Sequence, residues 1–129
     1  MELFIVWGTI TAWLFSEVLK VIFASYRCGK LDFKACIRYG GMPSSHSAFV
    51  SSLAVSVYVV QGLSALFIVC VALAVLVVRD IMVIRGTIDS LISELKLTKK
   101  IRLITHTPVE IGVGLGIGII VPLLLLLFF

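Results

Sequence analysis

Charged side chains are scarce in this sequence of 129 residues. Asp, Glu, Lys and Arg make up 14% of the chain, whereas hydrophobic residues make up 60%. Soluble domains have about 25% charged residues, and a chain with so few can accommodate its apolar surface only in lipid. The composition therefore excludes a soluble globular domain and predicts a single integral membrane domain over residues 1–129.

Cysteine and histidine are also scarce. The three cysteines are odd in number and share no tight spacing, which argues against a disulfide framework. A zinc site formed by Cys28, Cys36 and the two histidines is a weaker alternative, because their spacing matches no standard zinc motif. We therefore expect no metal and no other cofactor.

Acidic residues are outnumbered, seven against eleven Lys and Arg, which gives a net charge of +4. Most of the basic residues lie in two segments, 27–42 and 86–105, that flank apolar stretches. This distribution is typical of cytoplasmic loops that contact anionic lipid headgroups, and it argues against nucleic acid as a partner. We predict that both segments face the cytoplasm and that both termini lie outside.

Long apolar stretches predict an all-α membrane bundle of about four transmembrane helices. They cover residues 3–23, 43–60, 63–78 and 109–129. No basic region precedes the first stretch, so we expect a retained span rather than a cleaved signal. Gln61 and Gly62 form the expected turn between the second and third helices. Apolar residues then recur at helical spacing as far as Leu95, which predicts an amphipathic extension of the third helix.

Residues 40–47, GGMPSSHS, have the composition of a helix start that can bind an anion. Pro43 suits the first helical turn because it has no N–H group, and Ser44 and Ser45 can cap that turn. Backbone amides at a helix N-terminus attract anions, and Gly41 lets the backbone approach a ligand closely. The alternative is an ordinary capped start of a membrane helix.

A second helix start of similar composition follows at residues 105–110, THTPVE. His106 and Glu110 are four residues apart and therefore share one face of a helix. A carboxylate in that position can accept a hydrogen bond from one ring nitrogen and leave the other free to react. A single histidine would be interpreted as an interfacial polar residue. Two histidines at two such helix starts favour catalysis.

Four glycines follow in the last predicted helix, at every second position of the range 112–118. Small residues with this spacing let two helices approach closely. The Gly112–Gly118 stretch therefore predicts tight packing, either within the bundle or across a homodimer.

In a bundle of four alternating helices, the two helix starts share one membrane face with the ends of the first and third helices. Those ends carry Lys20 and Arg27 in the first helix and Arg85 with Asp80 in the third, and Glu17 and Lys20 are the charges that interrupt the first apolar stretch. Charges at membrane depth are functional candidates, and several cations beside a helix N-terminus are typical of a phosphate site. We expect Asp80 to hold one of these cations in place.

The spacing of Lys20 and Arg27, the sequence PSSH and the later pair of His106 and Glu110 resemble the phosphatidic acid phosphatase type 2 superfamily. Its divergent small membrane branch is the most similar part of that superfamily, which also includes bacterial acid phosphatases and vanadium haloperoxidases. The resemblance spans residues 20–110.

The sequence departs from the family pattern at several positions. Cysteine follows Arg27 where the family usually has proline, and Ser45 replaces a glycine. Twenty residues separate Arg85 from His106, whereas the family usually has five. The choice between Arg79 and Arg85 as the phosphate-binding arginine therefore stays open.

The resemblance implies a metal-independent phosphatase that acts on a lipid phosphate. In this mechanism His106, oriented by Glu110, attacks phosphorus to form a phosphohistidine, and His46 protonates the leaving oxygen. The phosphate oxygens would be held by Lys20, Arg27, Ser44, Ser45 and Arg85. A site at the cytoplasmic membrane face suits phosphatidic acid, phosphatidylglycerophosphate or a polyprenyl phosphate.

Two other functions fit the same residues. A non-catalytic membrane protein could use the cationic pocket to bind or transport a phosphorylated lipid, and tight binding without phosphate release would favour it. Vanadate-dependent oxidation would require bound vanadate, which a small helical membrane shell gives no evident means of retaining.

Overall fold

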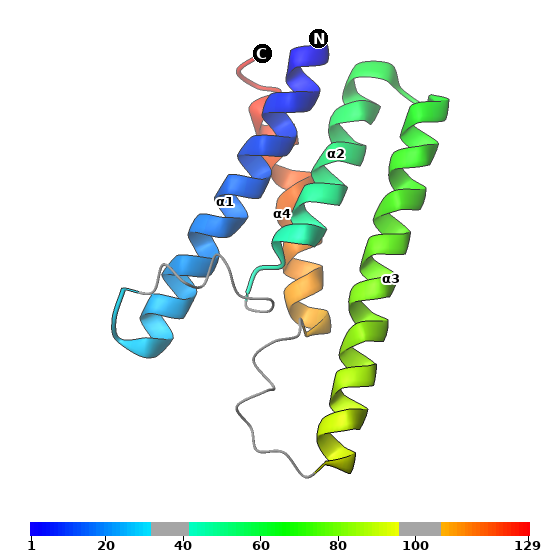
Figure 1. Cartoon of the computed structure of the whole chain (residues 1–129). Helices are drawn as coiled ribbons and strands as arrows, with labels where there is room; N and C mark the ends of the chain where they lie inside the picture. The colour runs from blue at the N-terminus through cyan, green and yellow to red at the C-terminus, as the bar shows by residue number, and fades with distance from the viewer. Residues whose placement is uncertain (32–41, 96–106) are drawn as a thin grey trace.

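The computed structural model describes residues 1–31, 42–95 and 107–129. Within these ranges the chain forms four helices and no strand: α1 (Glu2–Cys28), α2 (Ser45–Gln61), α3 (Ala65–Glu94) and α4 (Pro108–Leu125). The helices lie side by side in alternating directions (Figure 1). The end of α1, the start of α2, the end of α3 and the start of α4 therefore point to the same side, and the predicted all-α bundle is confirmed.

α2 is the helix around which the others pack, since it contacts α1, α3 and α4 (Figure 1). It is 17 residues long, about 26 Å, and nine of its residues are buried. The other three helices are each long and apolar enough to cross a membrane, and their outer faces carry many exposed apolar side chains. Lipid is the solvent that suits those faces, whereas α2 is held mainly by its neighbours.

Local chemistry explains where the helices end. α1 extends five residues beyond its apolar stretch, includes Arg27 in its last turn as predicted, and stops at Gly29, whose φ of 67° is a left-handed conformation that favours glycine. The turn predicted at Gln61 and Gly62 is confirmed, with Gly62 at a φ of 64°. α3 runs through the predicted amphipathic extension as one continuous helix and projects past the start of α2 (Figure 1).

The start of α2 corrects one prediction. Pro43 does not lie in the first helical turn, because Ser44 is the N-cap and Ser45 is the first helical residue. The serine takes the cap position because its hydroxyl can accept a hydrogen bond from the first turn, which proline cannot do.

Two of the four glycines of α4 face the inside of the bundle. A Cβ atom on Gly114 would overlap the carbonyl oxygen of Ser44, and one on Gly118 would overlap the hydroxyl of Ser51. A Cβ atom on Gly112 or Gly116 would meet nothing within 4 Å. Close packing within the bundle is therefore confirmed for Gly114 and Gly118, and the predicted homodimer stays a prediction.

Candidate functional site

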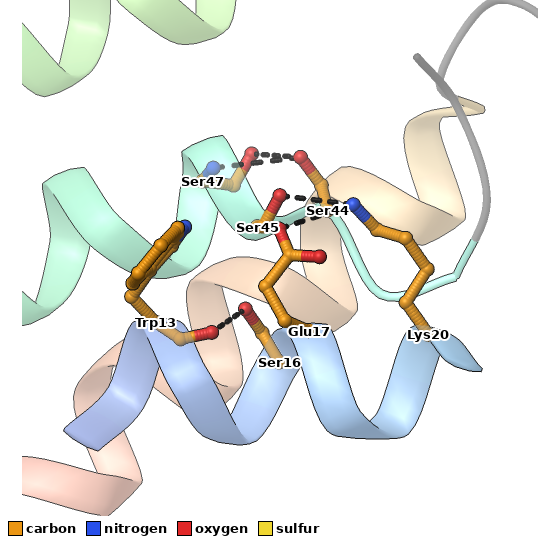
Figure 2. A network of polar contacts seen from close by, with 7 residues as sticks. All are labelled: Trp13, Ser16, Glu17, Lys20, Ser44, Ser45 and Ser47. Atoms are coloured by element: carbon orange, nitrogen blue, oxygen red, sulfur yellow. Dashed lines mark hydrogen bonds and ion pairs between the residues drawn. The ribbon is translucent and has the colours of Figure 1, made fainter. Parts of the chain in front are cut away.

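Lys20 is a charged residue buried between α1 and α2, with 4% of its surface exposed. Its Nζ donates a hydrogen bond to Ser45 Oγ at 3.0 Å and lies 3.4 Å from Glu17 Oε1 (Figure 2). A buried ammonium group is stable only when it is paired and hydrogen-bonded. The two partners therefore explain how the first helix carries a cation into the bundle.

The N-cap of α2 presents Ser45 to Lys20. Ser44 Oγ accepts hydrogen bonds from the Ser47 amide at 3.4 Å and from the Ser47 hydroxyl at 3.1 Å (Figure 2). Both serines are fully buried. Because the cap fixes the first turn of α2, the Ser45 hydroxyl points towards α1 and meets the Lys20 ammonium group.

A backbone hydrogen bond joins the two predicted helix starts. The Ser44 amide donates to the Glu110 carbonyl oxygen at 3.1 Å, and Gly114 lies directly against Ser44. The Ser44 amide donates within the protein and its Oγ accepts there, and its predicted contact with phosphate stays a prediction. Ser44 positions the first turn of α2, and Ser45 is the serine whose hydroxyl accepts a hydrogen bond from the cation.

The carboxylate of Glu110 closes a capping box at the start of α4. Its Oε2 accepts from the Thr107 amide at 2.8 Å, and the Glu110 amide donates to Thr107 Oγ1 at 3.2 Å. The arrangement holds the first turn of α4, whose N-cap Thr107 directly follows His106 in the sequence. His106 and Gly41 lie outside the described residues, so the predicted pair of His106 and Glu110 stays a prediction.

His46 and Arg27 are exposed side chains at the same end of the bundle. His46 lies in the first turn of α2, next to the buried Ser45, and Arg27 lies in the last turn of α1. Arg27 is seven residues beyond Lys20, which is about two helical turns on the same side of α1. The structure thus places both near the expected membrane face, whereas Lys20 lies deeper.

The two arginines of α3 have different surroundings. Arg85 Nε forms an ion pair with Asp89 Oδ2 at 3.4 Å, and 29% of its side chain is exposed. Arg79 is exposed and follows the inward-facing Cys70 by nine residues, about two and a half turns, so it points away from α2. Arg85 is about four turns from Cys70 and points to the same side as Cys70. This orientation favours Arg85 over Arg79 as the predicted phosphate-binding arginine.

Asp80 does not hold a cation in the described part of the chain. Its side chain is exposed, and the ion pairs found there join Lys20 to Glu17 and Arg85 to Asp89. Each pair joins two residues of the same helix, α1 for the first and α3 for the second. The partners are three or four residues apart, which is the ordinary spacing of side-chain pairs on a helix. The predicted role of Asp80 therefore finds no support in the contacts of the described residues.

Glu17 lies beside Lys20 and Ser45, and no part in phosphate binding was predicted for it from the sequence. Only 15% of its side chain is exposed, and its Oε2 is buried without a hydrogen-bond partner in the described residues. Its depth in an apolar helix was the available signal. Its contact with Lys20 follows from the spacing of three residues, but its place beside Ser45 depends on how α1 packs on α2.

An apolar groove of about 610 Å³ lies between α3 and α4. Its lining consists of Ala74, Val75, Val78, Arg79, Met82, Val83 and Leu115. Arg79 is the one charged residue in that lining.

In the described ranges no group of three or more His, Cys, Asp or Glu side chains could hold a metal ion, and Cys36 of the alternative zinc site lies outside them.

Comparison with known proteins gives one family and one curated relative. A family model described as the Divergent PAP2 family matches residues 1–121. The uncharacterized membrane protein YuiD of Bacillus subtilis (strain 168) is 39% identical over 74 residues, which cover 57% of this chain. The match spans 47% of the length of that relative. No solved structure matches the chain.

Proposed function

Because the chain belongs to the Divergent PAP2 family, we propose that this integral membrane protein is a metal-independent lipid phosphatase that forms a phosphohistidine. The observation that carries the proposal is the hydrogen bond from the buried Lys20 ammonium group to Ser45 Oγ at the start of α2. A cation beside a helix N-terminus stabilises the negative oxygens of a phosphate, and more so where water is excluded.

In the proposed reaction, the phosphate group lies at the start of α2, with Lys20 and the first-turn amides near its oxygens. A ring nitrogen of His106 attacks phosphorus, and the P–O bond to the lipid breaks as the P–N bond forms. His46 gives its proton to the leaving oxygen. Water then attacks phosphorus, returns a proton to His46, and breaks the P–N bond to release inorganic phosphate.

The geometry supports this assignment by bringing the two histidine-bearing helix starts together. The Ser44 amide is bonded to the Glu110 carbonyl oxygen, and His106 directly precedes Thr107, the N-cap of α4. The starts of α2 and α4, the helices next to the two histidines in the sequence, are therefore in contact. Arg27 and Arg85 lie at the same end of the bundle and are proposed to complete the charge around the phosphate.

The apolar surroundings favour a lipid as the substrate. The groove between α3 and α4, whose lining is apolar apart from Arg79, can accommodate a hydrocarbon chain. Phosphatidic acid, phosphatidylglycerophosphate and polyprenyl phosphates all combine such a chain with a terminal phosphate. The basic segments that flank the helices favour the cytoplasmic face for this site.

The test is phosphate release by the purified protein in detergent, with a chelator present, from a panel of these three lipids. We expect release from at least one lipid by the wild type and none by His106→Ala, with unchanged helical content. Lys30→Ala, at an exposed position after α1, is the matched control and keeps its activity. Lipid binding without phosphate release by the wild type would instead establish the non-catalytic function.

A further inference from the structure

Glu17 is a partly buried acid inside a site that is proposed to bind an anion. Its Oε1 lies 3.4 Å from Lys20 Nζ, and its Oε2 is buried with no hydrogen-bond partner in the described residues. The proposed reaction uses Lys20 and gives Glu17 no part. A carboxylate at this position needs another explanation, since an unpartnered buried oxygen is costly.

Glu17 lies beside the Lys20 ammonium group and the Ser45 hydroxyl (Figure 2). Lys20 supplies the cation from the same helix, and Ser45 supplies the hydroxyl from α2. A lysine ammonium group has three N–H donors, and two of them are directed to Ser45 Oγ and Glu17 Oε1. A phosphate oxygen that binds Lys20 must therefore share the ammonium group with Glu17 or displace its carboxylate.

We infer that Glu17 is a built-in counter-anion that holds Lys20 in the empty site and competes with phosphate for it. The inference rests on the proposed function, because it assumes that phosphate binds at Lys20. The carboxylate keeps the buried ammonium group paired before substrate enters. Once phosphate is bound, two anions lie close to one cation, and their repulsion weakens the binding. Glu17 is thus a positioning residue that limits phosphate affinity and favours release of the product.

The test compares Glu17→Gln with the wild type and with Glu2→Gln, a matched change at an exposed acid on the same helix. Inorganic phosphate is the probe, measured by calorimetry on the purified protein at constant ionic strength and as product inhibition of lipid hydrolysis. Glutamine keeps the length of the side chain and an oxygen acceptor for Lys20 but removes the charge. We expect the dissociation constant and the inhibition constant for phosphate to fall about tenfold.

Further readouts separate this role from a structural one. KM for the lipid falls in Glu17→Gln while kcat does not rise, and Glu17→Asp restores wild-type constants. The gain in phosphate affinity disappears when Glu17→Gln is combined with Lys20→Met, because the competition requires the cation. A merely structural Glu17 would show none of this dependence on charge and on Lys20.

Unchanged or weaker phosphate binding in a folded Glu17→Gln protein would overturn the inference, while leaving the proposed function intact if the wild type still binds and releases phosphate. A wild type that neither binds nor releases phosphate would overturn both. If Glu17→Gln does not fold, Glu17→Met is used, and tighter phosphate binding in that variant supports the inference. Failure of both variants to fold would overturn it, because Glu17 would then be a structural requirement.

Discussion

The Ser44 amide donates a hydrogen bond to the carbonyl oxygen of Glu110, across 3.1 Å and 66 positions of the sequence. This bond joins the N-cap residue of α2 to the first turn of α4. Ser44 Oγ also caps α2, so the same residue fixes both the direction of that helix and its distance from its neighbour. The relative position of the starts of α2 and α4 therefore depends on Ser44.

Gly114→Ala and Gly118→Ala are expected to destabilise the bundle by about 1–3 kcal/mol, because the added Cβ atoms overlap backbone or side-chain atoms of α2. Gly112→Ala and Gly116→Ala are the matched controls, since their Cβ atoms meet nothing within 4 Å. The controls are expected to be neutral or to stabilise by up to about 1 kcal/mol through helix propensity. Thermal unfolding in detergent, followed by helical circular dichroism, checks this difference. Equal effects at all four positions would contradict the packing of α4 on α2.

Lys20→Met is expected to lower kcat/KM for the lipid by about a hundredfold or more, because it removes the buried cation beside the phosphate. The methionine retains the apolar stem, so the helical content stays unchanged. Hydrolysis of the best lipid of the panel is the measurement, and Lys30→Met, which changes an exposed lysine after α1, is the control. Full activity of Lys20→Met would exclude Lys20 from the site.

Glu110→Gln separates the capping function of Glu110 from its proposed function in catalysis. Glutamine in this position preserves a capping box, so the variant should unfold at the wild-type temperature. Its neutral amide cannot stabilise a charged His106 ring, and we expect turnover to fall about a hundredfold. Thr107→Val is the converse variant, which tests capping rather than catalysis. Loss of the cap should lower the free energy of unfolding by about 1 kcal/mol. Wild-type turnover in Glu110→Gln would reduce Glu110 to a capping residue.

Arg85→Gln is expected to lower kcat/KM by roughly tenfold to a hundredfold, because it removes a charged contact to phosphate. Arg79→Gln, on the face of α3 that points away from α2, should change it far less. Parallel hydrolysis assays of the two variants make the comparison. A larger loss in Arg79→Gln would reverse the assignment and would place the phosphate in the groove between α3 and α4.

Local sequence predicted most of the fold. The apolar stretches indicate the helices, the Gln61-Gly62 turn separates α2 from α3, and the amphipathic pattern up to Leu95 predicts the long end of α3. The error lies at the start of α2, which begins after Pro43 because a serine is the better cap. α1 extends past its apolar stretch to the predicted Arg27, because a helix stops at a residue such as Gly29 rather than where hydrophobicity ends.

The sequence by itself determined that this is a helical membrane protein with its polar residues gathered at helix starts and ends, because hydrophobicity, capping and helical spacing act over a few neighbouring residues. Only the tertiary structure decided which of those residues meet. Lys20 reaches Ser45, Ser44 bonds to Glu110, and Gly114 rather than Gly112 lies against α2. Each of these contacts joins segments at least 25 positions apart, and their geometry depends on the rotation and separation of packed helices, which local pattern does not specify.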